Sequence, residues 1–303
     1  MIVAANFVLT AAHCVTRLTE EFPYLEVHQD VWVVAGESLR PTEGQKFSFA
    51  FRGTERRPDM IAPHELYPTD YFQIYDVAVL YFVDPLPIGS NSFVKSIKIG
   101  SPIDEPLSGC RAIGWGNTKW RYTRVYVYGT QKERTEVYRR NGYDKMSYGS
   151  PNRLMWGRVE VLSGSRGREV CHDSFNPFRH YCVVSGPEGG LPLKGDSGGP
   201  LVCRSRRRDD EGEDVVVGTV MYGDNGRYII YSRLHTYKKW LMGVRQKVVA
   251  NKWKIKELSG KLQEMKGVDG REKERMRQER NRRKRERRKE RRRRRREEQA
   301  RGT

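Results

Sequence analysis

Three short motifs contain residue types that could together carry out nucleophilic catalysis. Residues 195–200 read Gly-Asp-Ser-Gly-Gly-Pro, which places a serine in a glycine-rich turn that packing alone does not require. His13 ends the run Leu-Thr-Ala-Ala-His near the start of the chain, and Asp76 stands at the head of an apolar run. Acyl transfer at neutral pH needs a nucleophile and a base that takes its proton. The motifs therefore suggest Ser197 as nucleophile, His13 as base and Asp76 as the carboxylate that orients the base.

Each of these residues alone carries little weight. The chain has 6 histidines, and a single histidine is more often structural than catalytic, while Asp76 alone could be an ordinary carboxylate at a strand edge. The conjunction carries the argument, because the motifs follow one another in the order His, Asp, Ser and a Gly-Trp-Gly stands at residues 114–116. In these features the chain resembles the trypsin-like (chymotrypsin-fold) serine proteases over about residues 1–248.

The resemblance implies a role for each residue of the site. Ser197 would attack the peptide carbonyl, His13 would take its proton and deliver it to the leaving amine, and Asp76 would hold the imidazole in the right tautomer. The backbone N–H groups of Gly195 and Ser197 would form the oxyanion hole. Asp196 would pair with a new amino terminus released by proteolytic activation, which would fall upstream of the first residue. We therefore expect a disordered or zymogen-like site in the chain as written.

A second group of residues is expected to bind the substrate. Six residues before Ser197, where trypsins carry an aspartate that binds Lys or Arg, this chain has Leu191, and Ile229 stands where a small residue usually permits deep entry. This combination predicts a shallow apolar pocket. The remaining candidates are Lys194, Met221, Tyr222 and Gly223. The last three resemble the strand that pairs with the substrate backbone, and Met221 replaces a serine that supports the triad aspartate.

The five cysteines bear on the compartment of the protein. The resemblance pairs Cys110 with Cys203 and Cys171 with Cys182, which leaves Cys14, whose family partner would lie upstream of the first residue. Disulfides are typical of oxidising compartments, so we expect an extracellular, secreted protein, although the first residues do not form a signal peptide. An N-terminally truncated sequence would explain both the odd cysteine and the abrupt start. The alternative is a cytosolic protein with five reduced cysteines.

The fold is predicted to be all-β. Short runs rich in Val, Ile and Tyr are bounded by Gly, Pro, Asn and Asp, as in a sandwich or barrel. The resemblance implies two antiparallel six-stranded barrels, the first of them truncated, and a C-terminal helix near residues 237–242. We expect a protease domain at 1–248 and a charged extension at 249–303. A long surface loop at 117–150 would contact substrate or partners, or be a tolerated insertion.

The basic charge of the chain lies mostly in its tail. The net charge is +19, but residues 271–303 hold 19 Lys and Arg against 7 Asp and Glu, a net of +12, which leaves +7 for the rest. This tail is expected to be disordered or an isolated charged helix, and residues 252–266 an amphipathic continuation. The tail could bind a polyanion, such as a heparin-like chain or nucleic acid, or an anionic membrane, or simply be solvated. No apolar stretch approaches the length that spans a bilayer.

Three hypotheses for function follow. The first is a serine endopeptidase that cleaves peptide bonds through an acyl-enzyme, acts as a monomer and prefers apolar side chains. The second is a catalytically impaired homologue that binds partners through the 117–150 loop and the tail. A third hypothesis, a basic nuclear or cytosolic protein, is supported by the basic tail alone. We expect no metal and no cofactor, because no metal-ligand cluster or phosphate-binding loop is visible, and the acidic run at 209–214 suits a solvated hairpin loop better than a calcium site.

Overall fold

The computed structural model divides the chain into two compact units, Met1–Ala250 and Asn251–Thr303. The structure describes residues 1–18, 25–28, 30–39, 54–67, 74–89, 93–101, 106–117, 151, 153–162, 164–172, 175–186, 190–206, 212–224 and 227–261. Residues 118–150 of the expected surface loop lie outside this part, as do the tail at 271–303 and residues 209–211 of the acidic run at 209–214.

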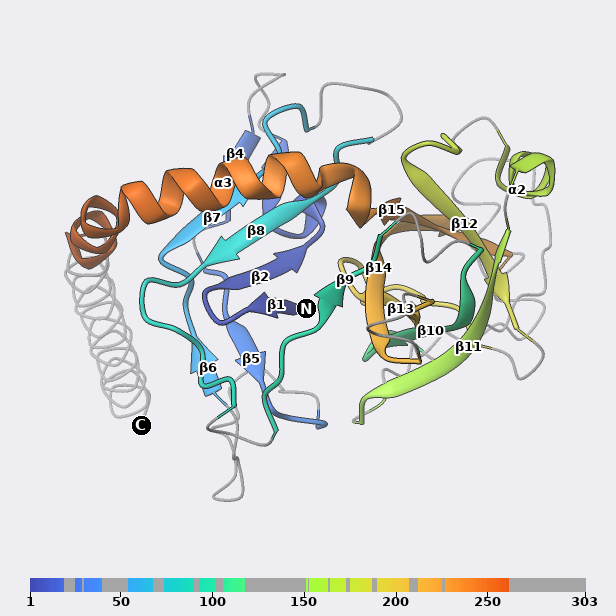
Figure 1. The fold of residues 1–303 in the computed structure, drawn as a ribbon, viewed down its shortest axis with the longest axis horizontal. Coiled ribbons are helices and arrows are strands. Elements are labelled where there is room, and N and C mark those ends of the chain that lie inside the picture. Colours follow the sequence, from blue (N-terminus) through green and yellow to red (C-terminus); the bar gives the residue numbers. More distant parts are fainter. Residues whose placement is uncertain are drawn as a thin grey trace, which may run out of the picture. The chain divides into compact units, whose positions relative to one another are not determined.

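The N-terminal half of the first unit contains three small antiparallel sheets (Figure 1). The strands are β1 (Ile2–Ala4), β2 (Phe7–Thr10), β3 (Thr16–Leu18), β4 (Leu25–Val27), β5 (Val33–Ala35), β6 (Thr54–Arg56), β7 (Met60–Pro63) and β8 (Ala78–Tyr81). One sheet has the order β1-β2-β8-β7, and the pairs β3-β4 and β5-β6 form two hairpins. Val8, Leu80 and Phe82 belong to the apolar cluster that packs this half. The sheet brings β2 beside β8, although the two strands are far apart in sequence.

The C-terminal half forms a closed barrel. Its strands are β9 (Lys98–Ile99), β10 (Ser108–Gly114), β11 (Met155–Leu162), β12 (His180–Ser185), β13 (Pro200–Arg204), β14 (Asp214–Asp224) and β15 (Tyr228–Arg233). The strand order is β13-β10-β11-β12-β15-β14-β9, and a further pairing of β13 with β14 closes six strands into a ring. All pairings are antiparallel except that of β9 with β14. Val183, Leu201 and Tyr231 lie fully buried in the interior of the barrel.

The predicted mostly-β trypsin-like fold with a C-terminal helix is confirmed. Of the two expected six-stranded barrels, the second closes, whereas the described strands of the first half remain in three separate sheets. Among the described strands of that half, β1, β2, β8 and β7 form one hydrogen-bonded sheet. The strands of the other two sheets pair with each other, β3 with β4 and β5 with β6. The catalytic candidates lie on the four-stranded sheet and on the closed barrel.

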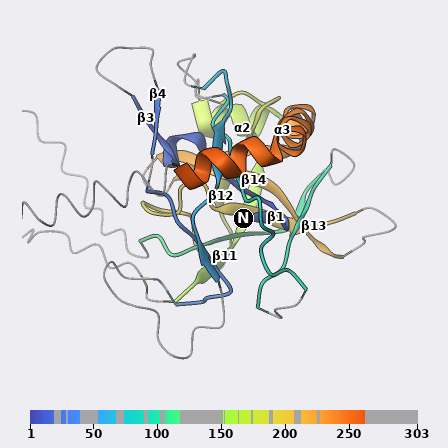
Figure 2. The same ribbon diagram turned by 90° about the vertical axis from the view of Figure 1, so that its left-hand side faces the viewer.

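Helices occupy few positions in the described chain. They are the 3-10 turns η1 (Ala12–Cys14) and η5 (Leu234–Tyr237) and the α-helices α2 (Gly164–Cys171) and α3 (Lys238–Ala250). Val244 and Val248, four residues apart on one face, are the buried residues of α3. In Figures 1 and 2, α3 passes across the four-stranded sheet, and Trp240 Nε1 donates to Glu65 Oε2 at 2.7 Å. In the second unit, residues 252–261 are helical. No helix of the described residues has the length and apolarity to cross a bilayer.

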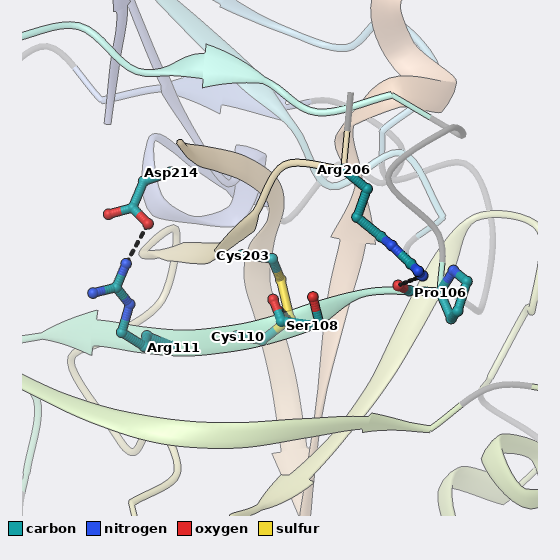
Figure 3. Close-up of a disulfide and its surroundings, with 7 residues drawn as sticks. All are labelled: Pro106, Ser108, Cys110, Arg111, Cys203, Arg206 and Asp214. Atoms are coloured by element: carbon teal, nitrogen blue, oxygen red, sulfur yellow. Dashed lines mark hydrogen bonds and ion pairs between the residues drawn. A yellow bond between two sulfur atoms is a disulfide. The ribbon is translucent and has the colours of Figure 1, made fainter. Parts of the chain in front are cut away.

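Both disulfides expected from the resemblance are confirmed. Cys110 on β10 and Cys203 on β13 join two neighbouring barrel strands across 93 residues of sequence (Figure 3). Next to them, Arg111 of β10 forms an ion pair with Asp214 of β14, which links β10 to a further strand of the barrel. The second disulfide joins Cys171 of α2 to Cys182 of β12, 11 residues apart. Cys14 is the free cysteine of the chain and is half-buried.

Candidate active site

The register of two neighbouring strands brings His13 and Asp76 together. His13 lies in η1, directly after β2, and Asp76 precedes β8, which pairs with β2 so that Thr10 faces Ala78. The Asp76 carboxylate is fully buried. Its Oδ2 lies 2.7 Å from His13 Nδ1, and its Oδ1 accepts the backbone N–H of His13 at 2.9 Å. Both carboxylate oxygens therefore contact the same residue, which orients the imidazole as a general base requires.

The second ring nitrogen of His13 has a thiol as its neighbour. Cys14 Sγ lies 3.6 Å from His13 Nε2. Burial of the ring lowers the pKa of His13, but the hydrogen bonds to Asp76 and Cys14 and the negative charge of Asp76 outweigh it and raise that pKa to about 10. The imidazole of His13 therefore holds its proton strongly in this arrangement. Cys14 Sγ contacts Nε2, which is the nitrogen that would have to take the proton of a nucleophile.

Ser197 lies exposed at the tip of two successive tight turns. The backbone N–H of Asp196 donates to Leu193 O at 3.0 Å, and that of Gly199 donates to Asp196 O at 2.8 Å. Gly195 has a φ of +102°, a conformation that a side chain would strain. The N–H groups of Gly195 and Ser197 make no hydrogen bond within the described residues, whereas their neighbours at 196, 198 and 199 all do. These two backbone N–H groups could therefore donate hydrogen bonds to a ligand.

Close backbone packing joins the serine turn to the histidine segment. A Cβ on Gly198, the residue after Ser197, would lie 2.9 Å from Ala11 N and 3.3 Å from Cys14 Sγ, and would overlap Thr10 Oγ1. Only glycine fits at this position. Gly198 N–H also donates to Val220 O of β14 at 2.9 Å, which fixes the turn to the barrel. Ser197 therefore lies where the barrel meets the segment after β2 that contains His13, and no hydrogen bond joins Ser197 to His13 among the described residues.

The Asp196 carboxylate is turned toward the Gly-Trp-Gly segment. Its Oδ1 accepts the N–H of Gly116 at 2.6 Å, and its Oδ2 accepts the N–H of Leu193 at 3.0 Å. A Cβ on Gly114 or Gly116 would overlap the carboxylate, so both glycines are required for this approach. The ammonium group of Met1 donates to Leu9 O at 2.8 Å instead. Asp196 thus has two backbone partners, where we expected an unpaired carboxylate.

The structure groups only some of the predicted substrate-binding residues. Leu191 packs, half-buried, against the barrel cluster that contains Ile229, and the Ile229 side chain presses against Gly223, where a Cβ would overlap it. Met221 belongs to a different cluster, around the Cys171–Cys182 disulfide, and Tyr222 packs against that cluster. Gly223 and Lys194 are exposed. Leu191 and Ile229 therefore belong to the same apolar cluster of the barrel, while Met221 belongs to another.

The sequence did not predict the residues that hydrogen-bond to the backbone at and near Asp76. Ser232 Oγ donates to the backbone carbonyl of Asp76 at 3.3 Å, and Tyr237 Oη donates to the carbonyl of Ile74. No sequence pattern links Ser232 to Asp76, because the two residues are 156 positions apart. Among the described residues, no group of three or more His, Cys, Asp and Glu side chains could hold a metal ion.

Comparison with known proteins places the chain in a family. The family model described as Trypsin matches residues 1–149 and 121–241. Trypsin eta of Drosophila melanogaster is 27% identical over 256 residues, covering 82% of this chain and 76% of that protein. Human serine protease 56 is 23% identical over 248 residues, covering 80% of this chain and 33% of that protein, so the chain spans about a third of its length.

Solved structures agree in fold. The structure of neuropsin, a serine protease expressed in the limbic system of mouse brain, aligns with a TM-score of 0.54 at 17% sequence identity. The alignment covers 81% of this chain and 87% of that one. Since the two family-model matches together extend from residue 1 to residue 241 and the closed barrel has the corresponding fold, this chain belongs to the trypsin family of serine proteases.

Proposed function

We propose that the protein is a serine endopeptidase in which His13, Asp76 and Ser197 form the catalytic triad. The observation that carries this proposal is the buried His13–Asp76 pair, joined at 2.7 Å, next to the turn that exposes Ser197. The close contact of Gly198 with Ala11 supports the nearness of the two halves of the site. The substrate is a protein or peptide, and no cofactor takes part.

The reaction divides into two acyl transfers. Ser197 Oγ attacks the carbonyl carbon while its proton moves to His13 Nε2, and collapse of the tetrahedral intermediate breaks the C–N bond as His13 returns the proton to the leaving amine. Water then attacks the Ser197 ester with His13 again as base, which releases the acid and restores the serine. For both steps His13 Nε2 has to face Ser197, so the contact with Cys14 Sγ has to give way.

Two backbone donors support the oxyanion stabilisation that these steps require. The N–H groups of Gly195 and Ser197 are the ones that the turn leaves without an internal acceptor. Donors that are already oriented toward the developing charge lower the barrier without reorganisation, and each contributes about 3 kcal/mol. Asp196 lies between them, so its bonds to Gly116 and Leu193 also hold these donors in place.

We further propose that the pocket accepts small or medium apolar side chains. Leu191 and Ile229 offer apolar surface at the place that the resemblance gives to the pocket, and neither carries a charge that would pair with Lys or Arg. A buried basic side chain without a counter-charge is costly. The preference of the enzyme is therefore for apolar residues on the acyl side of the cleaved bond.

The two disulfides favour an extracellular location, because such bonds persist in oxidising compartments. The basic segment 271–303 is proposed to bind a polyanion such as a heparin-like chain, since its net charge of +12 would release counterions on binding. Deletion of 271–303 is expected to abolish retention on immobilised heparin at physiological salt. Unchanged retention of the shortened chain would contradict this part of the proposal.

A fluorophosphonate probe tests the enzymatic proposal, because it reacts with a serine only where a base and an oxyanion hole activate it. The full-length, proteolytically activated protein is expected to be labelled at Ser197. Ser197→Ala and His13→Ala should both abolish labelling, whereas Ser205→Ala, which removes a buried serine on the same chain, should not. Absence of labelling under conditions that label a known protease would favour the second candidate, a homologue that binds through its basic tail.

A further inference from the structure

Two buried hydroxyl groups donate hydrogen bonds to the backbone at Asp76 and just before it. Ser232 Oγ donates to the Asp76 carbonyl at 3.3 Å, and Tyr237 Oη donates to the Ile74 carbonyl two residues earlier. The Ser232 and Tyr237 hydroxyls are also hydrogen-bonding neighbours. Ser232 is fully buried and Tyr237 nearly so. Because burial raises the pKa of Tyr237, its hydroxyl keeps its proton and remains a donor. We call these two side chains the hydroxyl bridge.

A further contact, from His64, holds the same stretch of backbone at residues 74–77. His64 N–H donates to the Val77 carbonyl at 3.0 Å. The His64 ring stacks on Tyr75 with ring centroids 4.6 Å apart, and it packs against Trp240 of α3 at 4.8 Å. Ser232, Tyr237 and His64 therefore donate to backbone carbonyls between residues 74 and 77, which fixes the backbone from which the Asp76 carboxylate extends.

The bridge connects the two halves of the proposed site. Ser232 belongs to β15, a strand of the closed barrel whose neighbours are Thr219 of β14 and His180 of β12. The same barrel carries Ser197 through the bond from Gly198 to Val220. Asp76, in contrast, belongs to the N-terminal half. A change at Ser232 would therefore shift the His13–Asp76 pair relative to the serine.

Among the described residues, only His13 forms hydrogen bonds with the Asp76 carboxylate. Both of its oxygens contact His13, and Met221, which stands where the resemblance places a supporting serine, has no hydroxyl to offer. We propose that Ser232 and Tyr237 are positioning residues that hold the backbone of Asp76 and thereby set the placement of the His13–Asp76 pair against Ser197. This inference rests on the proposed function, because it assigns these residues to the same triad.

Isosteric removal of the hydroxyls tests the proposal in the full-length, activated protein. Tyr237→Phe keeps the ring and deletes the donor, and Ser232→Ala deletes its partner. Thr219→Val is the matched control, because Thr219 is fully buried beside Ser232 and its hydroxyl has no partner among the described residues. Each bridge variant is expected to lower kcat about tenfold at unchanged KM, the equivalent of one lost hydrogen bond. The double variant should lose much less than the product of the two single effects.

A second readout separates positioning from stability. The Nδ1 proton of His13, assigned by its loss in His13→Gln, is followed by NMR with the pH titration of the ring. Loosening Asp76 weakens its bond to Nδ1, so the pKa of His13 should fall in both bridge variants and stay at the wild-type value in Thr219→Val. Ser232→Thr, which keeps the hydroxyl that Ser232→Ala removes, should show the wild-type titration of His13.

The outcomes distinguish this inference from the proposed function. If the wild type reacts with the fluorophosphonate and the bridge variants keep both kcat and the His13 titration, the positioning role is wrong and the triad stands. A melting temperature that falls while kcat and the titration stay unchanged would also overturn it, since the bridge would then be structural only. If the wild type does not react, the proposed function fails, and the NMR titration alone decides whether the bridge positions Asp76.

Discussion

Gly116→Ala should disturb the turn that holds Ser197 while leaving the three proposed triad residues unchanged. The new methyl group would overlap the Asp196 carboxylate, which accepts the N–H of Gly116 at 2.6 Å. Asp196 can escape only by rotating away, and then it also loses the N–H of Leu193 at 3.0 Å. Since Asp196 lies between the two proposed oxyanion donors, its displacement should move both.

The size of the effect follows from these contacts. Each hydrogen bond to a charged group contributes about 1.5 to 3 kcal/mol, and Asp196 would recover part of this from water because it is half-buried. We therefore expect a loss of stability of about 2 kcal/mol. Loss of one oxyanion donor lowers the rate about 100-fold or more, so labelling of Ser197 should slow by about two orders of magnitude.

The assay compares second-order rates of fluorophosphonate labelling, with melting temperature measured in parallel. Gly243→Ala is the matched control, because a Cβ at this position of α3 meets nothing within 4 Å and alanine favours the helix. The control should label at the wild-type rate. A Gly116→Ala protein that is folded and labels within twofold of the wild type would refute the role of Asp196 in holding the oxyanion donors.

Three further predictions follow from the same structure. Replacing both cysteines of a disulfide by alanine should lower the free energy of unfolding by about 4.7 kcal/mol for the bond that spans 93 residues and about 2.8 kcal/mol for the one that spans 11, measured by urea denaturation, and a reversed order would contradict the loop-entropy argument. Cys14→Ala should lower the pKa of His13, which the thiol helps to raise, so that more of the imidazole is neutral at a given pH below about 10; an unchanged NMR titration would argue against the contact. Leu191→Asp should shift cleavage from apolar toward Lys and Arg peptides, and an unchanged preference would show that Leu191 does not line the pocket.

Local patterns in the sequence were enough to predict the elements that carry the site. The apolar run after Asp76 is β8, fully buried, and its pairing with β2 brings Asp76 beside His13. The Gly-rich context of Ser197 predicted a tight turn, and Gly195 has the positive φ that such a turn needs. These features depend on residue types within a few positions of one another, which is why they can be read from one sequence.

Long-range contacts could not be predicted in the same way. The bond from Ser232 to the Asp76 carbonyl joins residues 156 positions apart, and it depends on the register of β15 against its neighbours. The bond from Gly116 to Asp196 spans 80 residues. Cys14 was expected to lack its disulfide partner, but its position on His13 Nε2 follows from side-chain packing, which no sequence pattern encodes.

Detection of an acyl-enzyme is the sharpest test of Ser197 as the nucleophile. The activated protein would be mixed with an excess of an activated ester of an apolar amino acid, quenched in acid within milliseconds and analysed by mass spectrometry. We expect a burst of one leaving group per active site and an acyl group on the peptide that contains Ser197, with neither in Ser197→Ala. Hydrolysis without a burst, or an acyl group on another residue such as Cys14, would contradict the assignment of Ser197 as nucleophile.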